Sequence, residues 1–76
     1  MGVIAMGWRT SKTNVIATPG QNGSTNYTVS SSVKLRLYGD NGSEHIELSA
    51  EESEDGRFFA AENLSEGFIL CVQEIN

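Results

Sequence analysis

One alternating segment constrains the fold of this chain more than any other feature of its sequence. Residues 33–38, with the sequence VKLRLY, alternate strictly between aliphatic and polar side chains, which is typical of a β-strand with one buried face. The Asn41-Gly42 step follows, and it favours the left-handed backbone of a tight turn. The alternation then resumes, with Ile46 and Leu48 expected to point inward. We therefore predict a β-hairpin over residues 33–48.

The rest of the chain reads as short strands separated by polar segments. We expect strands at 8–17, 27–29, 57–61 and 68–75, an exposed loop at 18–26, an acidic loop at 49–56 and a turn at 62–67. Five or six short strands of this kind predict an all-β domain, a small β-sandwich or barrel. Residues 1–76 are expected to form a single domain, with 1–7 flexible.

Size and cysteine content limit how such a domain can be stabilised. A chain of 76 residues has a core that supplies only about 3–5 kcal/mol of net stability. Cys71 is the only cysteine, so no disulfide forms within the chain, and a reducing, cytoplasmic location is expected. One cysteine and one histidine do not make a zinc site, and we predict no metal and no cofactor. Oligomerisation is the stabiliser that remains, and the start of the chain predicts neither an export signal nor a membrane segment.

Charge is divided unevenly along the sequence. Residues 1–39 hold four basic residues and no acid, a charge of +4, whereas residues 40–76 hold ten acids and one arginine, a charge of −9. The net charge of −5 disfavours nucleic acid as a partner, because binding to a polyphosphate relies on lysine and arginine. A candidate basic and aromatic patch comprises Trp8, Arg9, Lys12, Lys34, Arg36 and Tyr38. A candidate acidic surface comprises Glu51, Glu52, Glu54 and Asp55, although acidic loops also serve simply to keep a small domain soluble.

Candidate catalytic chemistry is sparse. His45 is the one side chain whose ordinary pKa lies near neutrality, but it occupies an outward hairpin position between acids. No nucleophile motif or Cys/His spacing accompanies it, and we predict that the chain is not an enzyme. The acids at 51–55 do not follow the spacing of a calcium loop, so a solvated acidic loop is the favoured interpretation.

The stretch 33–72 resembles the trp RNA-binding attenuation protein family. The shared features are a strand, a glycine turn and a second strand, followed by Arg57-Phe58, Glu62, Leu64, Gly67 and Leu70. The resemblance implies a β-sandwich subunit that joins edge to edge into a closed ring, with small ligands or RNA held between adjacent subunits. Asn63 stands where the family has an RNA-contacting lysine, and Phe59 and Ala60 replace its paired histidines. The later Lys-x-Arg contact has no counterpart before Asn76. Only the architecture is therefore expected to carry over.

Two functional hypotheses follow. The first is a non-enzymatic binding or assembly module that self-associates through strand edges and opposed charge patches, giving a homo-oligomer that closes into a ring if the rotation allows. The alternative is a small acidic accessory or inhibitor protein, similar to those of phages, that binds a basic site on a different protein.

Overall fold

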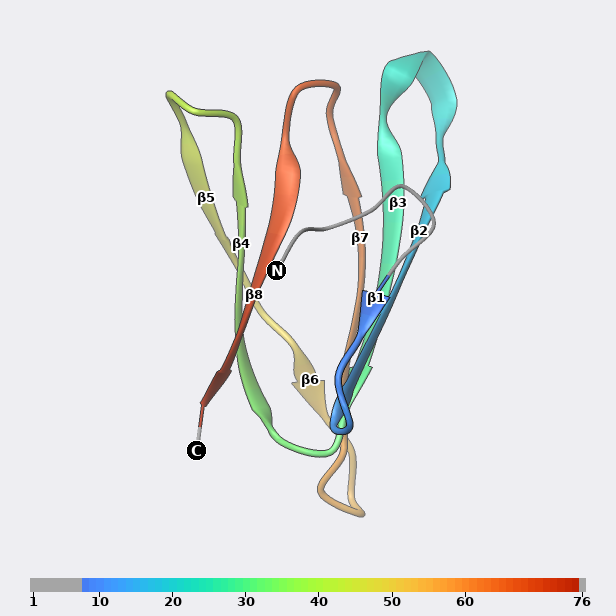
Figure 1. The fold of residues 1–76 in the computed structure, drawn as a ribbon, viewed down its shortest axis with the longest axis vertical. Coiled ribbons are helices and arrows are strands. Elements are labelled where there is room, and N and C mark those ends of the chain that lie inside the picture. Colours follow the sequence, from blue (N-terminus) through green and yellow to red (C-terminus); the bar gives the residue numbers. More distant parts are fainter. Residues whose placement is uncertain (1–7, 76) are drawn as a thin grey trace.

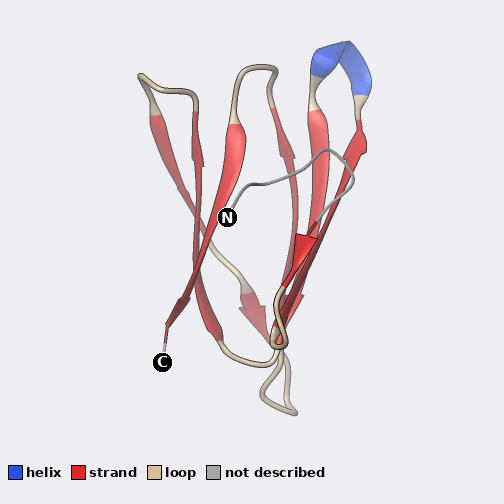
Figure 2. Ribbon diagram, viewed as in Figure 1, coloured by secondary structure: helices blue, strands red, loops and turns tan. Residues whose placement is uncertain are grey.

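The computed structural model describes residues 8–75, with Trp8 and Arg9 described by their backbone. These residues form eight strands and one 3-10 turn, with no α-helix among them (Figures 1 and 2). In chain order the elements are β1 (Trp8–Arg9), β2 (Thr13–Pro19), η1 (Gln21–Gly23), β3 (Thr25–Ser31), β4 (Lys34–Asp40), β5 (His45–Leu48), β6 (Glu51–Glu52), β7 (Phe58–Leu64) and β8 (Ile69–Ile75). The prediction of a small all-β domain is confirmed for this part of the chain. The predicted flexibility of residues 1–7 lies outside it.

The strands form two antiparallel sheets that enclose one core. The large sheet has the strand order β1-β2-β3-β7-β6, and the small sheet has the order β5-β4-β8. The link between β5 and β6 carries the chain from the small sheet to the large one, whereas β8 pairs only with β4. Since no strand pair joins the two sheets between residues 8 and 75, the architecture is a sandwich and not a closed barrel.

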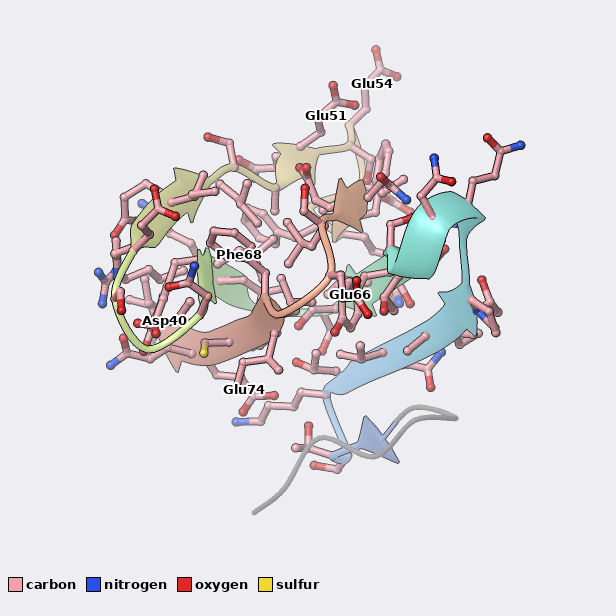
Figure 3. All side chains as sticks on the ribbon, turned by 90° about the horizontal axis from the view of Figure 1, so that it is seen from above. Asp40, Glu51, Glu54, Glu66, Phe68 and Glu74 are labelled. Atoms are coloured by element: carbon pink, nitrogen blue, oxygen red, sulfur yellow. The ribbon has the colours of Figure 1, made fainter. Side chains whose placement is uncertain are left out.

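The core is built from both sheets. Nine buried apolar side chains form it: Val15, Ala17, Tyr27, Val29, Ala60 and Leu64 from the large sheet, and Leu35, Leu37 and Leu70 from the small one. Half-buried Leu48, Ala50, Phe68 and Val72 pack against this cluster. Figure 3 shows Phe68 on the inner side of the β7–β8 turn, where it helps to cover one end of the sandwich.

β4 and β5 form the hairpin expected from the sequence. Their turn is held by Asn41, whose Oδ1 accepts hydrogen bonds from the backbone N–H groups of Ser43, at 2.8 Å, and Glu44, at 2.6 Å. Gly42 has a φ of 94°, the left-handed conformation that glycine adopts without steric cost. The two strands are therefore joined at the Asn41-Gly42 turn that the sequence predicts.

The two strands of the hairpin differ in how completely their inward-facing side chains are buried. Leu35 and Leu37 on β4 are 7% and 0% exposed, in line with the alternation of the sequence. Leu48 lies opposite Leu37 and is half-buried. Ile46, however, is 42% exposed although we expected it inside. It lies on an edge strand opposite Gly39, whose lack of a side chain leaves Ile46 little to pack against.

The structure divides the single strand expected at 8–17 into two. β1 and β2 form a hairpin, and the Thr10 hydroxyl oxygen accepts hydrogen bonds from the backbone N–H groups of Lys12, at 3.0 Å, and Thr13, at 2.9 Å. Threonine hydroxyls stabilise turns in this way, and Thr10 therefore interrupts the strand. Together with the two-residue β6 inside the expected acidic loop, this raises the number of strands to eight among residues 8–75, against the five or six predicted.

Long-range pairing also lengthens β2, β3 and β7 beyond the predicted limits. β2 continues to Pro19 and β3 begins at Thr25, so the exposed connection occupies residues 20–24, a narrower span than the 18–26 that we expected. β7 runs on to Leu64 because its last residues pair with β3, with Leu64 opposite Thr25. The turn predicted at 62–67 therefore reduces to residues 65–68, closed by the backbone bond from Phe68 N–H to the Ser65 carbonyl at 3.0 Å.

Candidate interaction surfaces

The six residues predicted to form one basic and aromatic patch lie on two different sheets. Three of them alternate along the outer face of β4 in the small sheet: Lys34, Arg36 and Tyr38. The other three belong to β1 and to the turn that follows it in the large sheet: Trp8, Arg9 and Lys12. The fold thus produces two groups of three residues, because β1 and β4 are separated by the core between the sheets.

The outer face of the small sheet carries a cluster of stacked and paired side chains. Arg36 donates a hydrogen bond from Nη2 to Glu47 Oε2 at 2.6 Å, and its Cζ lies 4.7 Å from the centroid of the Tyr38 ring. The Tyr38 and His45 rings stack with centroids 4.5 Å apart and an interplanar angle of 23°. His45 Nε2 also contacts the Glu47 carboxylate, and its Nδ1 lies 3.9 Å from Asp40 Oδ2.

Arg36 and Tyr38, two of the three β4 residues, are therefore already paired with side chains of the same chain. The bond from Arg36 and then the contact with His45 lower the pKa of Glu47, and the same carboxylate raises the pKa of Arg36. Arg36 and His45 both pack against the Tyr38 ring, so its faces are not free to stack on a nucleobase. Lys34 is the remaining cation of this group, and its exposed side chain has no ion-pair partner among the described residues.

The four candidate acidic residues gather at one corner of the sandwich. Glu51 and Glu52 form β6, and Glu54 and Asp55 lie in the turn that follows it. All four side chains are exposed, and Figure 3 shows Glu51 and Glu54 projecting away from the core. Asp55 accepts a hydrogen bond from the Ser53 hydroxyl, which lowers the pKa of its carboxyl group. We call this group, residues 51–55, the acidic corner.

The opposite corner, where β8 lies beside the β1–β2 turn, is held together by Glu74. Its Oε2 accepts hydrogen bonds from the hydroxyls of Thr10, at 2.8 Å, and Thr13, at 2.5 Å. The Thr13 hydroxyl also lies 2.8 Å from the Ser31 hydroxyl, and both of these side chains are buried. Because Glu74 belongs to the small sheet and its partners to the large one, the carboxylate links the two sheets (Figure 3). We call this the Glu74 corner.

Sequence reasoning missed the role of Glu74. In the sequence it is a polar residue near the end of the last strand, and its threonine partners precede it by 64 and 61 positions. The hydroxyl bonds from Thr13 and Thr10 lower the pKa of its carboxyl group. The one available signal was the alternation of β8, which places Glu74 on the same face as Leu70 and Val72.

The outer edge of β8 is open along the described chain. β8 is seven residues long and pairs with β4 on one side alone. Two large apolar side chains on its outer face, Ile69 and Ile75, are 54% and 41% exposed. Cys71, between them on the same face, is half-buried and free. A long strand edge with exposed isoleucines is the feature that natural proteins usually shorten, cover or charge.

Comparison with known proteins adds no relative. No protein-family model, curated protein or solved structure matches the chain. The described residues contain no helix with the length and apolar composition that a membrane crossing requires. Within residues 8–75, no three His, Cys, Asp or Glu side chains are grouped so as to hold a metal ion. The resemblance of residues 33–72 to the trp RNA-binding attenuation protein family stays a prediction from the sequence.

Proposed function

We propose that this chain is a non-enzymatic binding and assembly module that self-associates through the edges of its sandwich. The observation that carries the proposal is the open, seven-residue edge of β8 with Ile69 and Ile75 exposed beside it. Unpaired backbone groups on such an edge are a template for a strand of another chain, and burying the isoleucines would add apolar contact. The proposal includes a reducing, cytoplasmic location, since Cys71 has no cysteine partner in the chain.

The geometry favours a head-to-tail contact. β5 and β8 are the two edges of the small sheet, and both run antiparallel to β4, so they point in the same direction. A copy placed beside the first in the same orientation would therefore add its β5 to β8 in parallel. The same step brings its acidic corner towards the β1–β2 turn, where Lys12 is exposed. Opposite charges would then favour this contact. A heterologous contact of this kind gives a closed ring when the rotation between neighbouring copies is a whole-number fraction of 360°.

Size-exclusion chromatography with light scattering tests self-association. At low salt we expect a mass of several protomers, and at high salt a smaller mass, because exposed charges more than about 10 Å apart are screened at 0.1 M ionic strength. A mass of one protomer, 8.2 kDa, under both conditions would overturn the proposal.

Cysteine cross-linking distinguishes the head-to-tail contact from a two-fold one. If two β8 strands paired with each other, oxidation of the unaltered protein would join Cys71 to Cys71 and stop at a covalent dimer. Glu47 and Cys71 both lie opposite Tyr38, so in the head-to-tail contact Glu47 of the next copy is level with Cys71, and a Glu47→Cys variant should form a ladder of covalent oligomers on oxidation. A Cys71→Ser, Glu47→Cys double variant is the control and should not form the ladder. A covalent dimer of the unaltered protein as the sole product would rule out the head-to-tail arrangement.

The second candidate function is an accessory protein that docks its acidic corner on a basic site of another protein. It is favoured by the exposure of all four acids at 51–55. Under this alternative the chain is monomeric at every salt concentration, and amide substitution of the four acids abolishes capture of a basic partner. If the same substitutions instead lower the mass of the oligomer, the acidic corner belongs to self-association.

A further inference from the structure

A shallow, open depression lies at the end of the large sheet where η1 meets the β7–β8 turn. Its lining consists of Pro19, Gly20, Gln21, Asn22, Ser24, Asn26, Asn63 and Ser65. Figure 1 shows these connections at the opposite end of the large sheet from the β6–β7 turn. The depression is therefore separate from the acidic corner and from the Glu74 corner.

Three side chains of this lining are held in a fixed arrangement. Asn63 donates two hydrogen bonds from Nδ2, one to Ser24 Oγ at 3.0 Å and one to Asn26 Oδ1 at 2.7 Å. Ser24 Oγ in turn donates to the Gln21 carbonyl at 2.7 Å. Two side-chain groups of this network have no side-chain partner among the described residues. They are the amide oxygen Oδ1 of Asn63 and the amide nitrogen Nδ2 of Asn26. The network thus presents an oriented acceptor beside an oriented donor.

The backbone of Gly20 lies close to the side chains of this network. Gly20 has an extended backbone, with φ −108° and ψ −163°, which any residue adopts. A Cβ at this position would nevertheless lie 2.4 Å from Ser24 Oγ and 3.0 Å from Asn63 Nδ2. Glycine often occupies places where another group must approach the backbone closely. Nearby Asn22 holds a left-handed conformation, with φ 59°, and strained residues of this type gather at functional sites.

The lining carries no charged residue, although 20% of the chain is charged. The carboxylate of Glu66, the residue after Ser65, packs over Gly23 of η1, where an added Cβ would lie 2.8 Å from its Cδ (Figure 3). The Glu66 carboxylate would repel an anionic ligand, and every polar side chain of the lining is a neutral amide or hydroxyl. The chemistry therefore favours a neutral ligand that exchanges hydrogen bonds with amides and hydroxyls.

We propose that this depression binds a neutral, hydroxyl-rich ligand of the saccharide class. Each of two vicinal hydroxyls can donate and accept a hydrogen bond. One can therefore donate to Asn63 Oδ1 while the other accepts from Asn26 Nδ2. Pro19 supplies an apolar surface for a sugar ring. Because the site is open and shallow, its affinity is weak, with dissociation constants in the millimolar range. The inference does not depend on self-association.

The test is a nuclear magnetic resonance titration of the unaltered protein with four neutral trisaccharides: maltotriose, cellotriose, xylotriose and N-acetylchitotriose. We expect saturable shifts of the amide signals of residues 20–26 and 63–65 with at least one of them. Lactose and 3′-sialyllactose form a matched neutral and anionic pair, and the anionic sugar should bind about fivefold more weakly because of Glu66. If none of these sugars produces saturable shifts at these residues, the proposal is overturned.

Two variants tie binding to the depression. Gly20→Ala fills the space beside Asn63 and should abolish the shifts, while Asn14→Ala, on the outer face of the same sheet but at its other end, should leave them unchanged. Should Gly20→Ala fail to fold, the Gln21→Ala, Ser65→Ala double variant serves instead, because neither side chain makes a hydrogen bond in the described structure. That double variant should weaken binding about tenfold. Unchanged affinity in a folded variant would refute the site.

Discussion

At the scale of single residues, the Glu74 corner depends on one carboxylate and two threonine hydroxyls. Glu74 Oε2 accepts from Thr10 and Thr13, and Thr13 also contacts the buried hydroxyl of Ser31. Ser31 Oγ completes the chain of contacts by accepting the backbone N–H of Val33 at 3.1 Å. Because a buried hydroxyl without a partner is destabilising, each member of this network has a measurable role.

Glu74 makes the stability of the protein sensitive to acid. Its pKa is lower in the folded protein than its ordinary value, so its contribution is fully present above the unfolded-state pKa of about 4.3. The contribution is lost as the pH falls through the lower folded-state pKa. We expect Glu74→Gln to lower the free energy of unfolding at pH 7 and to flatten its decline with acid, measured by urea unfolding across this pH range. Exposed Glu54→Gln is the control, and an equally steep decline in Glu74→Gln would contradict the prediction.

Thr13 tests the buried part of the same network. Thr13→Val keeps the shape of the side chain but removes the hydroxyl, so the buried Ser31 hydroxyl loses its side-chain partner and Glu74 keeps only its bond from Thr10. We expect a loss of about 1–3 kcal/mol in the free energy of unfolding, measured by urea denaturation. Thr28→Val, on the exposed face of β3, should change it by less than about 0.5 kcal/mol. Equal effects of the two substitutions would show that the Thr13 hydroxyl makes no special contribution.

At the scale of elements, β4 is the strand on which the small sheet depends. It pairs with β5 on one side and with β8 along all seven of its residues on the other. Its inner residues, Leu35 and Leu37, are buried, while its outer residues carry the stacked cluster with His45 and Glu47. β5, in contrast, is short and lies at an edge. Equivalent apolar substitutions on the two strands should therefore differ strongly in cost.

Leu37→Ala should lower the free energy of unfolding by about 2–5 kcal/mol, because Leu37 is fully buried on a strand that is paired on both sides. Since the whole domain has only about 3–5 kcal/mol to lose, this variant should be largely unfolded by circular dichroism. Ile46→Ala on β5 removes a comparable aliphatic side chain that is 42% exposed, and it should cost less than about 1.5 kcal/mol. A larger loss for Ile46→Ala would mean that β5 is buried by something beyond this one chain.

At the scale of the whole molecule, the two sheets are connected differently at two corners of the sandwich. The backbone connects them at one corner, and side-chain hydrogen bonds connect them at the other. The link from β5 to β6 joins the sheets at the acidic corner, while Glu74 joins them at the other. The open edge of β8 lies at the Glu74 corner, diagonally across the sandwich from the acidic corner (Figure 3). In the proposed head-to-tail contact, β5 of one copy would lie beside β8 of the next and so continue the small sheet.

Lysine on the exposed face of β8 should block that assembly. We expect the Ile69→Lys, Ile75→Lys double variant to elute with the mass of a single protomer at low salt, since lysines on strand edges prevent pairing. Thr28→Lys introduces the same side chain on β3, which is paired on both sides, and should retain the mass of the unaltered protein. Loss of assembly in both variants would point to a general effect of charge and count against the β8 edge.

The sequence by itself determined the features that rest on local physics. The alternation of residues 33–38 and the Asn41-Gly42 turn predicted the hairpin at 33–48, and the short strand patterns elsewhere predicted an all-β domain, because strand period and turn conformation depend on neighbouring residues.

Tertiary structure alone decided the pairing and the surfaces. The extension of β7 to Leu64 and the bond from Thr13 to Glu74 join residues far apart in the sequence, where local pattern carries no information. For the same reason the predicted basic patch was divided between two sheets. Which faces share a surface is set by how the sheets pack against each other.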